Sequence, residues 1–447
     1  MLALAAGAGP TLLAACGGGT GTTSSSGPKS LSILQWSHFV PRYDKWFDPF
    51  VQQWGSKNNV HVRVDHIDNS LIPARTAAEI NAGSGHDLIE WIVPASQYET
   101  AVVDVSDVVK QIESKYGSQI DYCKMSSYNP VTHKYYGFCH GYAADPGDYL
   151  KSLYTDVGLP NGPTTYDELL TYGTEIYKKK GVRVGLGMSA EVDSNMAARA
   201  MIWSFGGSIQ DAQGNVVFNS PETVAAVEYM VKLFKQSESS EVFSWTAASN
   251  NQGLVAGQLN YILNSISAYR TAQRTRPDIA DDIFFVPALK GPSGQGVASE
   301  HVVYSYIIPK FSKNVDTAKQ FLVDYVGSYH DSVYQSELYN FPAFKNTPAQ
   351  KSLFGSGGWL DNDPFGSKPA SKLAVLKTAP QWSTNVGHPG PSNAAIGEIF
   401  TSAVLPNMMA SAAKGSETPA QAVASAEAQI KSIFAKWRSK GLVGGSR

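Results

Sequence analysis

The stretch WSFGGSIQDAQGNVVFNSPETVAAVEYMVKLF, residues 203–234, decides the fold of this chain. Gly206-Gly207 lets the backbone turn at positive φ, because glycine has no Cβ atom that would clash. Residues 211–215 carry a turn signal that leads into a short strand over residues 216–218. A helix is expected from residues 220–222, where Ser is the N-cap, Pro takes the first helical position and Glu follows. Four apolar residues at helical spacing form its expected buried stripe: Val224, Val227, Val231 and Phe234.

The length and composition limit the class of protein. A chain of 447 residues is too long for a single core and indicates two or three domains. Its 43% hydrophobic and 17% charged residues are typical of a globular protein. A net charge of −2 argues against a nucleic-acid partner, which would require a strong basic excess. After the N-terminus there is no apolar run of about 18 residues, so we expect no transmembrane segment.

The first part of the chain alternates strands with helices. Residues 31–36 and 60–65 read as strands, and a third strand ends at Trp91. Residues 43–54 and 74–82 read as the helices between them. Such alternation predicts an α/β layer with a largely parallel sheet.

Two helix starts are marked by capping boxes. Thr165 is followed three residues later by Glu168, and Thr418 is followed in the same way by Gln421. The first of these helices is expected to stop at residues 178–181, where three lysines precede a glycine.

The order of these motifs resembles a known family. Gly206-Gly207 with its turn and capped helix, the segment GSGHD at residues 83–87, PTTYDELL at 163–170 and AKQFLVDYV at 318–326 are similar to signatures of extracellular solute-binding proteins of ABC importers. The resemblance is to the sugar-binding, maltose-binding-protein-like class. It implies a two-lobe α/β fold of the type II periplasmic-binding-protein kind, with a hinge and about three crossings. It also implies a carbohydrate ligand between the lobes, a permease partner, a monomer, no cofactor and no enzymatic activity.

The expected division of the chain follows from this resemblance. The first lobe would comprise residues 31–143 and 297–335, and the second would comprise residues 144–296 and 336–447. Residues 1–16 would be a signal peptide, and residues 17–30 a flexible tether rich in Gly, Ser and Thr.

The N-terminal segment matches a lipobox. The apolar start ends in LAACG, which makes Cys16 the expected lipidated residue and places the protein outside the cytoplasm on a membrane anchor. A signal peptide normally opens with positive charge, which is missing here, so an upstream start is left open. In an oxidising compartment Cys123 and Cys139 can form a disulfide, and two buried free thiols are the alternative.

Candidate ligand contacts follow from where strands end. Ligands of α/β sheets bind beyond the carboxyl ends of strands, and flat rings cover the apolar faces of sugars. This rule indicates Trp36 and His38 after the first strand and Trp91 after the third, and Tyr142 and Asp145 lie at the first expected crossing.

The resemblance implies further contacts from the second lobe and from a late loop. Each can instead be a core aromatic or a polar residue that caps a loop, which is the preferred interpretation for Asp145, Asp193 and Ser267. The residues carried over are Asp193, Trp203, Asn264, Ser267, Trp382, Asn385 and His388.

Three short motifs could indicate other functions, and each lacks a required feature. The segment GFCHG around Cys139 has the shape of a nucleophile elbow but is followed by Asp-Pro-Gly rather than by a helix. His61 and His66 flank Asp65, but their parity places them on opposite faces of a strand. Residues 291–296 lack the Lys of a P-loop. A binding protein for a polyol or glycerol phosphate, and a secreted glycan-degrading enzyme, are the alternatives.

Overall fold

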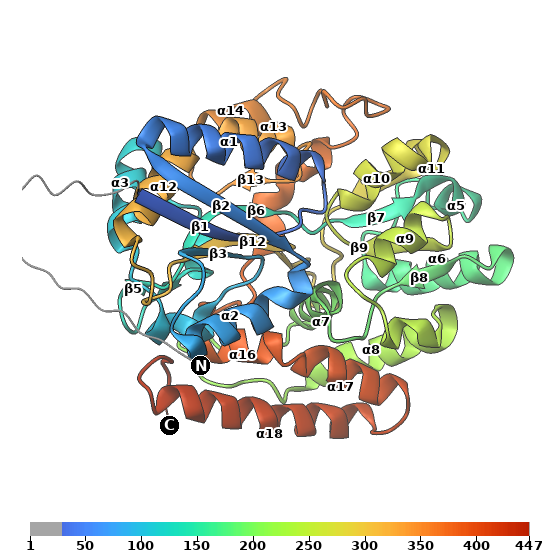
Figure 1. The fold of residues 1–447 in the computed structure, drawn as a ribbon. Helices are drawn as coiled ribbons and strands as arrows, with labels where there is room; N and C mark the ends of the chain where they lie inside the picture. Colours follow the sequence, from blue (N-terminus) through green and yellow to red (C-terminus); the bar gives the residue numbers. More distant parts are fainter. Residues whose placement is uncertain (1–28, 447) are drawn as a thin grey trace, which may run out of the picture.

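The computed structural model describes residues 29–446, which contain two main sheets (Figure 1) and two short strand pairs. The first sheet has the strand order β13-β6-β12-β3-β1-β2, and the second has the order β10-β7-β9-β8. The first sheet consists of β1 (Lys29–Trp36), β2 (Val60–Ile67), β3 (Leu88–Trp91), β6 (Phe138–Ala143), β12 (Val302–Ile307) and β13 (Phe341–Pro342). The second consists of β7 (Gly147–Leu150), β8 (Arg183–Gly185), β9 (Leu259–Leu263) and β10 (Ile283–Val286).

Helices surround both sheets. In Figure 1, α1 lies above the first sheet and α2 below it. The helices around the first sheet are α1 (Arg42–Asn58), α2 (Ile72–Ala82), α3 (Ser106–Tyr116), α4 (Asp121–Met125), α12 (Val315–Gly327), α13 (Tyr329–Gln335) and α14 (Pro348–Phe354). Those of the second lobe are α5 (Lys151–Asp156), α6 (Tyr166–Lys180), α7 (Val192–Phe205), α8 (Pro221–Ser237), α9 (Ser249–Val255), α10 (Ser267–Thr275) and α11 (Pro277–Asp282).

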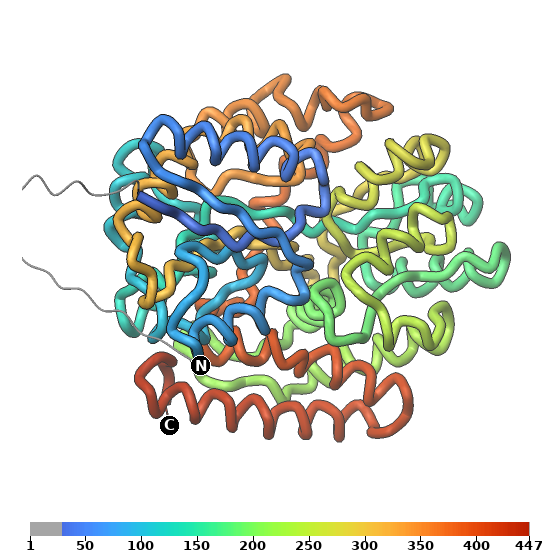
Figure 2. Tube along the Cα trace, in the orientation of Figure 1, coloured from blue at the N-terminus to red at the C-terminus, as the bar shows by residue number. Residues whose placement is uncertain are grey.

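The C-terminal segment runs under both lobes. Figure 2 shows it in red along the base of the molecule. It contains α15 (Ala379–Trp382), α16 (Ala394–Thr401), α17 (Val404–Ala413) and α18 (Pro419–Arg438). Helix α16 packs against the short helix η2 (Ser96–Ala101) of the first lobe, whereas α17 and α18 pack against α8 of the second. The remaining short strands pair as β4 (Tyr128–Asn129) with β5 (Lys134–Tyr135), and as β11 (Ala298–Ser299) with β14 (Ser383–Thr384).

Both sheets are mixed, which corrects the expectation of a largely parallel sheet. β1 pairs in parallel with β2 and β3, as the strand–helix alternation predicts. β12 returns from the second lobe and pairs antiparallel with both β3 and β6. β1 also begins at Lys29, so the last two residues of the expected tether belong to the sheet.

The stretch at residues 203–234 folds largely as its local signals predict. Gly206 ends α7 at a φ of 99°, and the Ser220 side chain caps α8 by accepting a hydrogen bond from the Thr223 amide. The expected strand at 216–218 is reduced to a single bridge between Gln210 and Val216. The buried face of α8 is also rotated from the expected stripe, because Val224, Val231 and Phe234 are only half-buried. The apolar side chains of α8 that are fully buried are Ala226, Val227, Met230 and Leu233.

The chain leaves the first lobe later than residue 335. β13 pairs with β6 of the first sheet, and α14 packs against α13 and β13. The chain reaches the second lobe at Asp363, whose carboxylate forms an ion pair with Arg270 of α10. The expected boundary is therefore too early, because short strand pairing between distant segments leaves little signal in the sequence.

Helix α7 lies between the two sheets and is buried along its whole length. A helix that is buried on every side is surrounded by core, not by solvent. The two lobes therefore share one packed interior around α7. None of the helices within residues 29–446 combines the length and apolar character needed to cross a membrane.

The Arg270–Asp363 pair is a buried ion pair that connects α10 to the loop that follows α14. Arg270 Nη1 lies 2.7 Å from Asp363 Oδ2, both side chains are fully buried, and Arg270 Nε also donates to the Glu337 carbonyl. Removal of one partner leaves an uncompensated buried charge.

We therefore expect Asp363→Ala to lower the free energy of unfolding by about 3–5 kcal/mol. Lys179→Ala, which removes an exposed ion pair with Glu175, is the control and should lower it by no more than about 0.5 kcal/mol. Urea unfolding of both variants measures the difference. Equal effects of the two substitutions would contradict the structural role of the buried pair.

Candidate functional site

Two carboxylates and one imidazole meet where the chain passes between the lobes. Asp145 lies in the crossing between β6 and β7, His301 lies directly before β12, and Asp193 is in the first turn of α7. His301 Nδ1 is 3.2 Å from Asp145 Oδ1, and its Nε2 is 3.5 Å from Asp193 Oδ1. The imidazole therefore connects a crossing with the second lobe.

Asp148 and Tyr339 complete this group. Asp148 lies on β7, and Tyr339 lies in the loop between α13 and β13. Burial raises the pKa of Tyr339, and the charges of Asp193, Asp145 and Asp148 raise it further. The Tyr339 hydroxyl is thus in the electric field of all three carboxylates. We call Asp145, Asp148, Asp193, His301 and Tyr339 the hinge cluster.

Several polar atoms of the hinge cluster lack a hydrogen-bond partner within residues 29–446. These are Asp145 Oδ2, both carboxylate oxygens of Asp148 and the Tyr339 hydroxyl, whereas Asp145 Oδ1 and Asp193 Oδ1 face only the His301 ring. All four side chains are buried. Buried polar atoms are nearly always hydrogen-bonded, and an unpartnered one costs about 1–3 kcal/mol. The cluster is therefore suited to groups supplied from outside the chain.

The pKa values of the charged groups in the cluster depend on their burial and on the charges of their neighbours. Burial raises the pKa values of Asp145, Asp148 and Asp193 above their usual range, because it disfavours the ionised form. Burial alone would lower the pKa of His301, but the neighbouring carboxylates of Asp145, Asp193 and Glu191 raise it overall.

An aromatic wall from the first lobe lies beside the hinge cluster. The Trp36 ring stacks on His38 at a centroid distance of 4.8 Å and lies nearly parallel to Tyr304 at 6.1 Å. The His38 ring meets Tyr339 edge-on at 5.3 Å, which joins the wall to the cluster. The Tyr304 hydroxyl and the Trp36 indole nitrogen are buried without a hydrogen-bond partner in the described chain.

His38 is held in one tautomer. Its Nδ1 accepts a hydrogen bond from the Val40 amide at 2.9 Å, so Nε2 carries the hydrogen and donates to Asn340 Oδ1 at 2.9 Å. Burial lowers the pKa of His38 to about 4, which keeps the ring neutral near pH 7. The ring is thus a fixed, uncharged surface.

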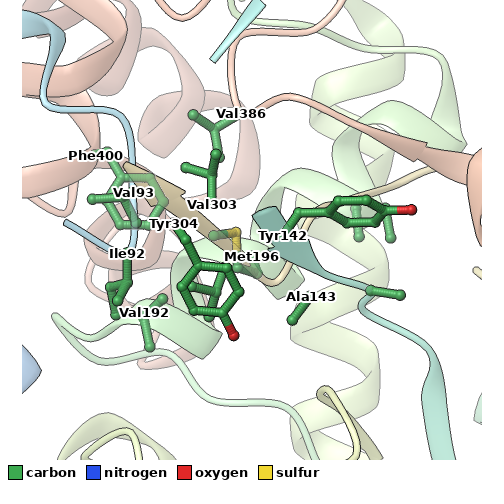
Figure 3. Close-up of a cluster of buried hydrophobic side chains, with 14 of the residues drawn as sticks. Ile92, Val93, Tyr142, Ala143, Val192, Met196, Val303, Tyr304, Val386 and Phe400 are labelled. Carbon is green, nitrogen blue, oxygen red and sulfur yellow. The ribbon is translucent and has the colours of Figure 1, made fainter. Parts of the chain in front are cut away.

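A cavity of about 650 Å³ lies between residues of the two lobes. The first lobe lines it with Asp68, Asn69, Ser70, Pro73, Ala74, Ile92 and Val93, and the second lobe lines it with Glu191, Val192 and Trp245. Glu191 and Val192 directly precede Asp193 in the sequence, but the lining of the cavity includes no residue of the hinge cluster. Figure 3 shows Ile92 of the first lobe close to Val192 of the second, with Tyr304 of β12 beside them.

The model of the family described as bacterial extracellular solute-binding protein matches residues 41–328, more than half of the chain. The chain belongs to this family. No curated protein gives a significant sequence match.

Solved structures of solute-binding proteins share the fold. Maltose-bound MalE3 of T. maritima is 18% identical, with a TM-score of 0.74 over 90% of this chain and 99% of that one. A sugar transporter protein of Arthrobacter chlorophenolicus A6 with bound laminaribiose is 15% identical, with a TM-score of 0.75 and coverages of 90% and 99%. A ribitol-bound protein of Agrobacterium radiobacter K84 is 17% identical, with a TM-score of 0.70 and coverages of 91% and 99%. The predicted two-lobe periplasmic-binding-protein fold is confirmed.

In this solute-binding protein the structure brings four of the expected residues together. Trp36 and His38 belong to the aromatic wall, and Asp145 and Asp193 belong to the hinge cluster. The preferred sequence interpretation of the two aspartates as loop caps does not describe them. Within residues 29–446 neither carboxylate accepts a backbone hydrogen bond, and Glu191, rather than Asp193, caps α7.

Trp91 and Tyr142 lie on the other face of the first sheet. Trp91 is paired with Ser305 in the sheet and packs against Tyr98 at 5.5 Å. Tyr142 is paired with Val303 and packs edge-on against Tyr122 at 5.0 Å. Figure 3 shows the Tyr142 and Tyr304 hydroxyls pointing in different directions. Neither residue contacts the aromatic wall. Successive residues of a strand point to opposite faces of the sheet, and these two point to the face away from the wall. The position of the strand end in the sequence does not show which face a residue occupies.

Asn264 and Ser267 lie on the second-lobe side of the boundary and are already hydrogen-bonded. The Asn264 amide donates to Asn251 Oδ1, and Asn251 Nδ2 donates to Ser267 Oγ at 3.0 Å. Asn251 lines a second cavity, of about 440 Å³, together with Phe39.

The remaining expected contacts belong to the end of α7 and to the segment around α15 and β14. Trp203 is ten residues after Asp193 on α7, about 15 Å along the helix. Its ring meets His388 edge-on at 5.6 Å. Asn385 Oδ1 accepts from the Gly387 amide and from Ser392 Oγ, and Trp382 donates to Thr378. These side chains stabilise the loop after α15.

The cysteine predictions have different outcomes. Cys123 and Cys139 are both free and buried, so the expected disulfide is absent from this structure. Burial raises the pKa of Cys123 well above its usual value, which disfavours the thiolate that disulfide formation requires. Cys139 lies within β6 and not at a strand–helix turn, which removes the basis of the nucleophile-elbow interpretation. Cys16 lies outside the described residues.

Sequence reasoning missed His301, Tyr339, Tyr304 and Asp148. His301 directly precedes β12, and its place beside the end of β3 follows only from the antiparallel pairing of these two strands. Tyr339 and Asp148 gave no local signal either, because their significance depends on contacts between distant segments.

The raised pKa of His301 predicts a pH dependence of stability. A group whose pKa is higher in the folded state contributes stability that is full below its unfolded value of 6.5 and is lost as the pH rises through its folded pKa. The unliganded protein should therefore lose its stability advantage over His301→Gln as the pH rises above 6.5. Urea unfolding of both proteins across this range measures the difference. A difference that stays constant or grows with pH would contradict the contacts of His301 with Asp145 and Asp193.

Proposed function

We propose that this protein captures a sugar between its two lobes and delivers it to the permease of an ABC importer. The observation that carries the proposal is the hinge cluster, whose unpartnered polar atoms lie beside an aromatic wall. Sugars offer many hydroxyl groups around apolar ring faces. The cluster would bind the hydroxyl groups, and the rings of Trp36, His38 and Tyr304 would cover an apolar face.

The comparisons support the class of ligand and partner. The solved structures of the same fold hold maltose, laminaribiose and ribitol. The ligand here would be a mono- or oligosaccharide, with a polyol as the nearest alternative. The proposal includes a monomer that acts outside the cytoplasm, a lipid anchor at Cys16 and no catalytic step.

Closure of the lobes would report the bound ligand to the permease. The hinge cluster joins a crossing, the second lobe and the loop before β13, so a ligand bound there contacts parts that move relative to one another. A ligand that supplies the missing hydrogen bonds stabilises the closed form over the open form. The permease would then recognise the closed form.

Tyr339→Phe tests the site because it removes a hydroxyl that has no partner in the described chain. We expect the unliganded protein to be more stable than wild type by about 1–3 kcal/mol, because the substitution removes a buried hydroxyl that has no hydrogen-bond partner. Sugar binding should weaken about 2–10-fold, which corresponds to one hydrogen bond of about 0.5–1.5 kcal/mol. A thermal-shift screen of neutral sugars and polyols identifies a ligand, and calorimetry then measures Kd for both proteins.

Tyr136→Phe is the matched control. The Tyr136 hydroxyl is equally buried but donates to the carbonyls of Ser126 and Ser392. This variant should lose about 1 kcal/mol of stability and bind sugar as wild type does. The proposed site is wrong if Tyr339→Phe binds sugar unchanged. If no sugar or polyol binds the wild-type protein, the proposed function is wrong.

A further inference from the structure

Two cavities along the boundary between the lobes adjoin one another. The cavity of about 650 Å³ and the cavity of about 440 Å³ share two lining residues, Phe39 of the first lobe and Ala248 of the second. We call these two cavities together the interlobe groove. Cavities of about 300–1,000 Å³ are typical for a drug-sized ligand, which is larger than a single hexose. The interlobe groove is therefore larger than one hexose requires.

Phe39 connects the interlobe groove to the proposed sugar site. Its half-buried ring lies 5.1 Å from the ring of Trp36 and 6.3 Å from the ring of Tyr339, measured between centroids. Trp36 belongs to the aromatic wall, and Tyr339 belongs to the hinge cluster. A sugar unit on Phe39 would thus be the neighbour of a unit bound by the wall and the cluster.

Trp245 lines the interlobe groove from the second lobe and is also half-buried. Its loop is fixed, because the Trp245 carbonyl accepts from Ser189 Oγ at 2.8 Å and the Thr246 amide donates to Ser249 Oγ at 2.9 Å. The indole also rests against Gly187, where a Cβ atom would lie 3.3 Å from Cε3. A ring that is already fixed loses little freedom when a ligand binds.

The groove does not end at Trp245. This residue also lines a cavity of about 550 Å³ whose other lining residues, between 181 and 259, all belong to the second lobe. The space beside the indole therefore continues from the boundary between the lobes onto the second lobe alone.

The polar lining of the interlobe groove suits uncharged sugar units. Its three charged side chains are already bonded within the chain: Arg276 to Asp278, Asp68 to Ser70, and Glu191 to the first amides of α7. Uncharged hydrogen-bonding groups between aromatic rings match sugars, which present hydroxyls around apolar faces. The uncharged polar residues of the lining are Asn69, Ser70, Asn195, Thr246, Asn251, Gln252, Thr271 and Thr401.

We propose that the ligand is an oligosaccharide, not a monosaccharide, and that Phe39 and Trp245 bind separate units of it. This inference rests on the proposed function, because it names the length of sugar that the same site takes. One terminal unit would lie on the aromatic wall and the hinge cluster, and the following units would pass over Phe39 to Trp245. Since the space continues past Trp245, a longer chain would extend out of the groove and still bind.

Three series of neutral sugars test the inference. They are the malto-, cello- and laminari-oligosaccharides, each measured by calorimetry from glucose to the pentasaccharide. In a series that binds, we expect the affinity to rise at least about tenfold from glucose to the trisaccharide, because further units stack on Phe39 and Trp245. From the trisaccharide to the pentasaccharide Kd should change by less than about threefold, because the added units lie outside the groove.

Trp245→Ala and Phe39→Leu identify the rings responsible. Each removes a flat ring, so each should reduce the gain in affinity from glucose to the trisaccharide about tenfold, and Trp245→Ala should leave the Kd of glucose within about twofold of wild type. Trp245→Phe keeps an aromatic face and should retain most of the gain. The two ring-removing variants are independent, so one that fails to fold leaves the other as the test.

Trp359→Ala is the matched control. Trp359 is a half-buried tryptophan of the first lobe that packs against His330 at 4.8 Å and Tyr334 at 5.6 Å, and it lines neither cavity of the interlobe groove. Its removal should leave the dependence of Kd on chain length unchanged.

The outcomes separate the two proposals. Glucose that binds as tightly as the trisaccharide overturns the inference and leaves the proposed function intact. A gain with chain length that survives in both Trp245→Ala and Phe39→Leu, or that Trp359→Ala reduces equally, also overturns it. Failure of the pentasaccharide to bind contradicts the continuation of the groove past Trp245. If no sugar of the three series binds, the result counts against the proposed function and the inference fails with it.

Discussion

The contact of His301 with Asp145 and Asp193 is the interaction on which the interlobe structure depends. It joins a residue before β12, a residue in the first crossing and the first turn of α7, so it fixes the relative positions of both lobes. At 3.2 and 3.5 Å these are ion-pair distances in a fully buried setting. Burial disfavours the ionised form of both carboxylates, and the attraction to the imidazole offsets part of that cost.

The same contact brings together buried polar atoms that a ligand could satisfy in the closed arrangement of the lobes. Unpartnered oxygens of Asp145 and Asp148 and the hydroxyls of Tyr304 and Tyr339 are buried together, each at a cost of about 1–3 kcal/mol. Without a ligand, opening of the lobes would let water reach these atoms. A ligand that replaces the water shifts the balance toward closure by its differential affinity for the closed form. Binding and closure are therefore one event in this account.

The aromatic wall is rigid because the first lobe supports it from behind. His38 is fixed by Val40 and Asn340, and the Tyr43 hydroxyl lies 2.6 Å from that of Tyr325 in the layer beneath. A fixed surface does not lose side-chain freedom when a ligand arrives, which favours affinity. In contrast, the hinge cluster belongs to segments that connect the lobes. The site thus combines one preformed face with one face that closure completes.

Local signals in the sequence were sufficient for much of the fold. The capping boxes at Thr165 and Thr418 form as predicted, because each requires only residues three positions apart. The expected crossing indicated Asp145, and the strand-end rule indicated Trp36 and His38, whose rings stack in the structure. That rule did not find which face of the sheet Trp91 occupies, since parity depends on pairing with β12. Tyr339 and the lobe boundary were also beyond local reasoning, because both depend on contacts between segments hundreds of residues apart.

A crystal structure of the protein with a bound sugar tests the central claim most directly. The account predicts ligand donors within hydrogen-bond distance of Asp145, Asp193 and the Tyr339 hydroxyl, with a sugar face against Trp36 or Tyr304. A sugar held only by Asp68, Ser70 and Trp245 in the outer cavity, with the hinge cluster unchanged, would contradict it.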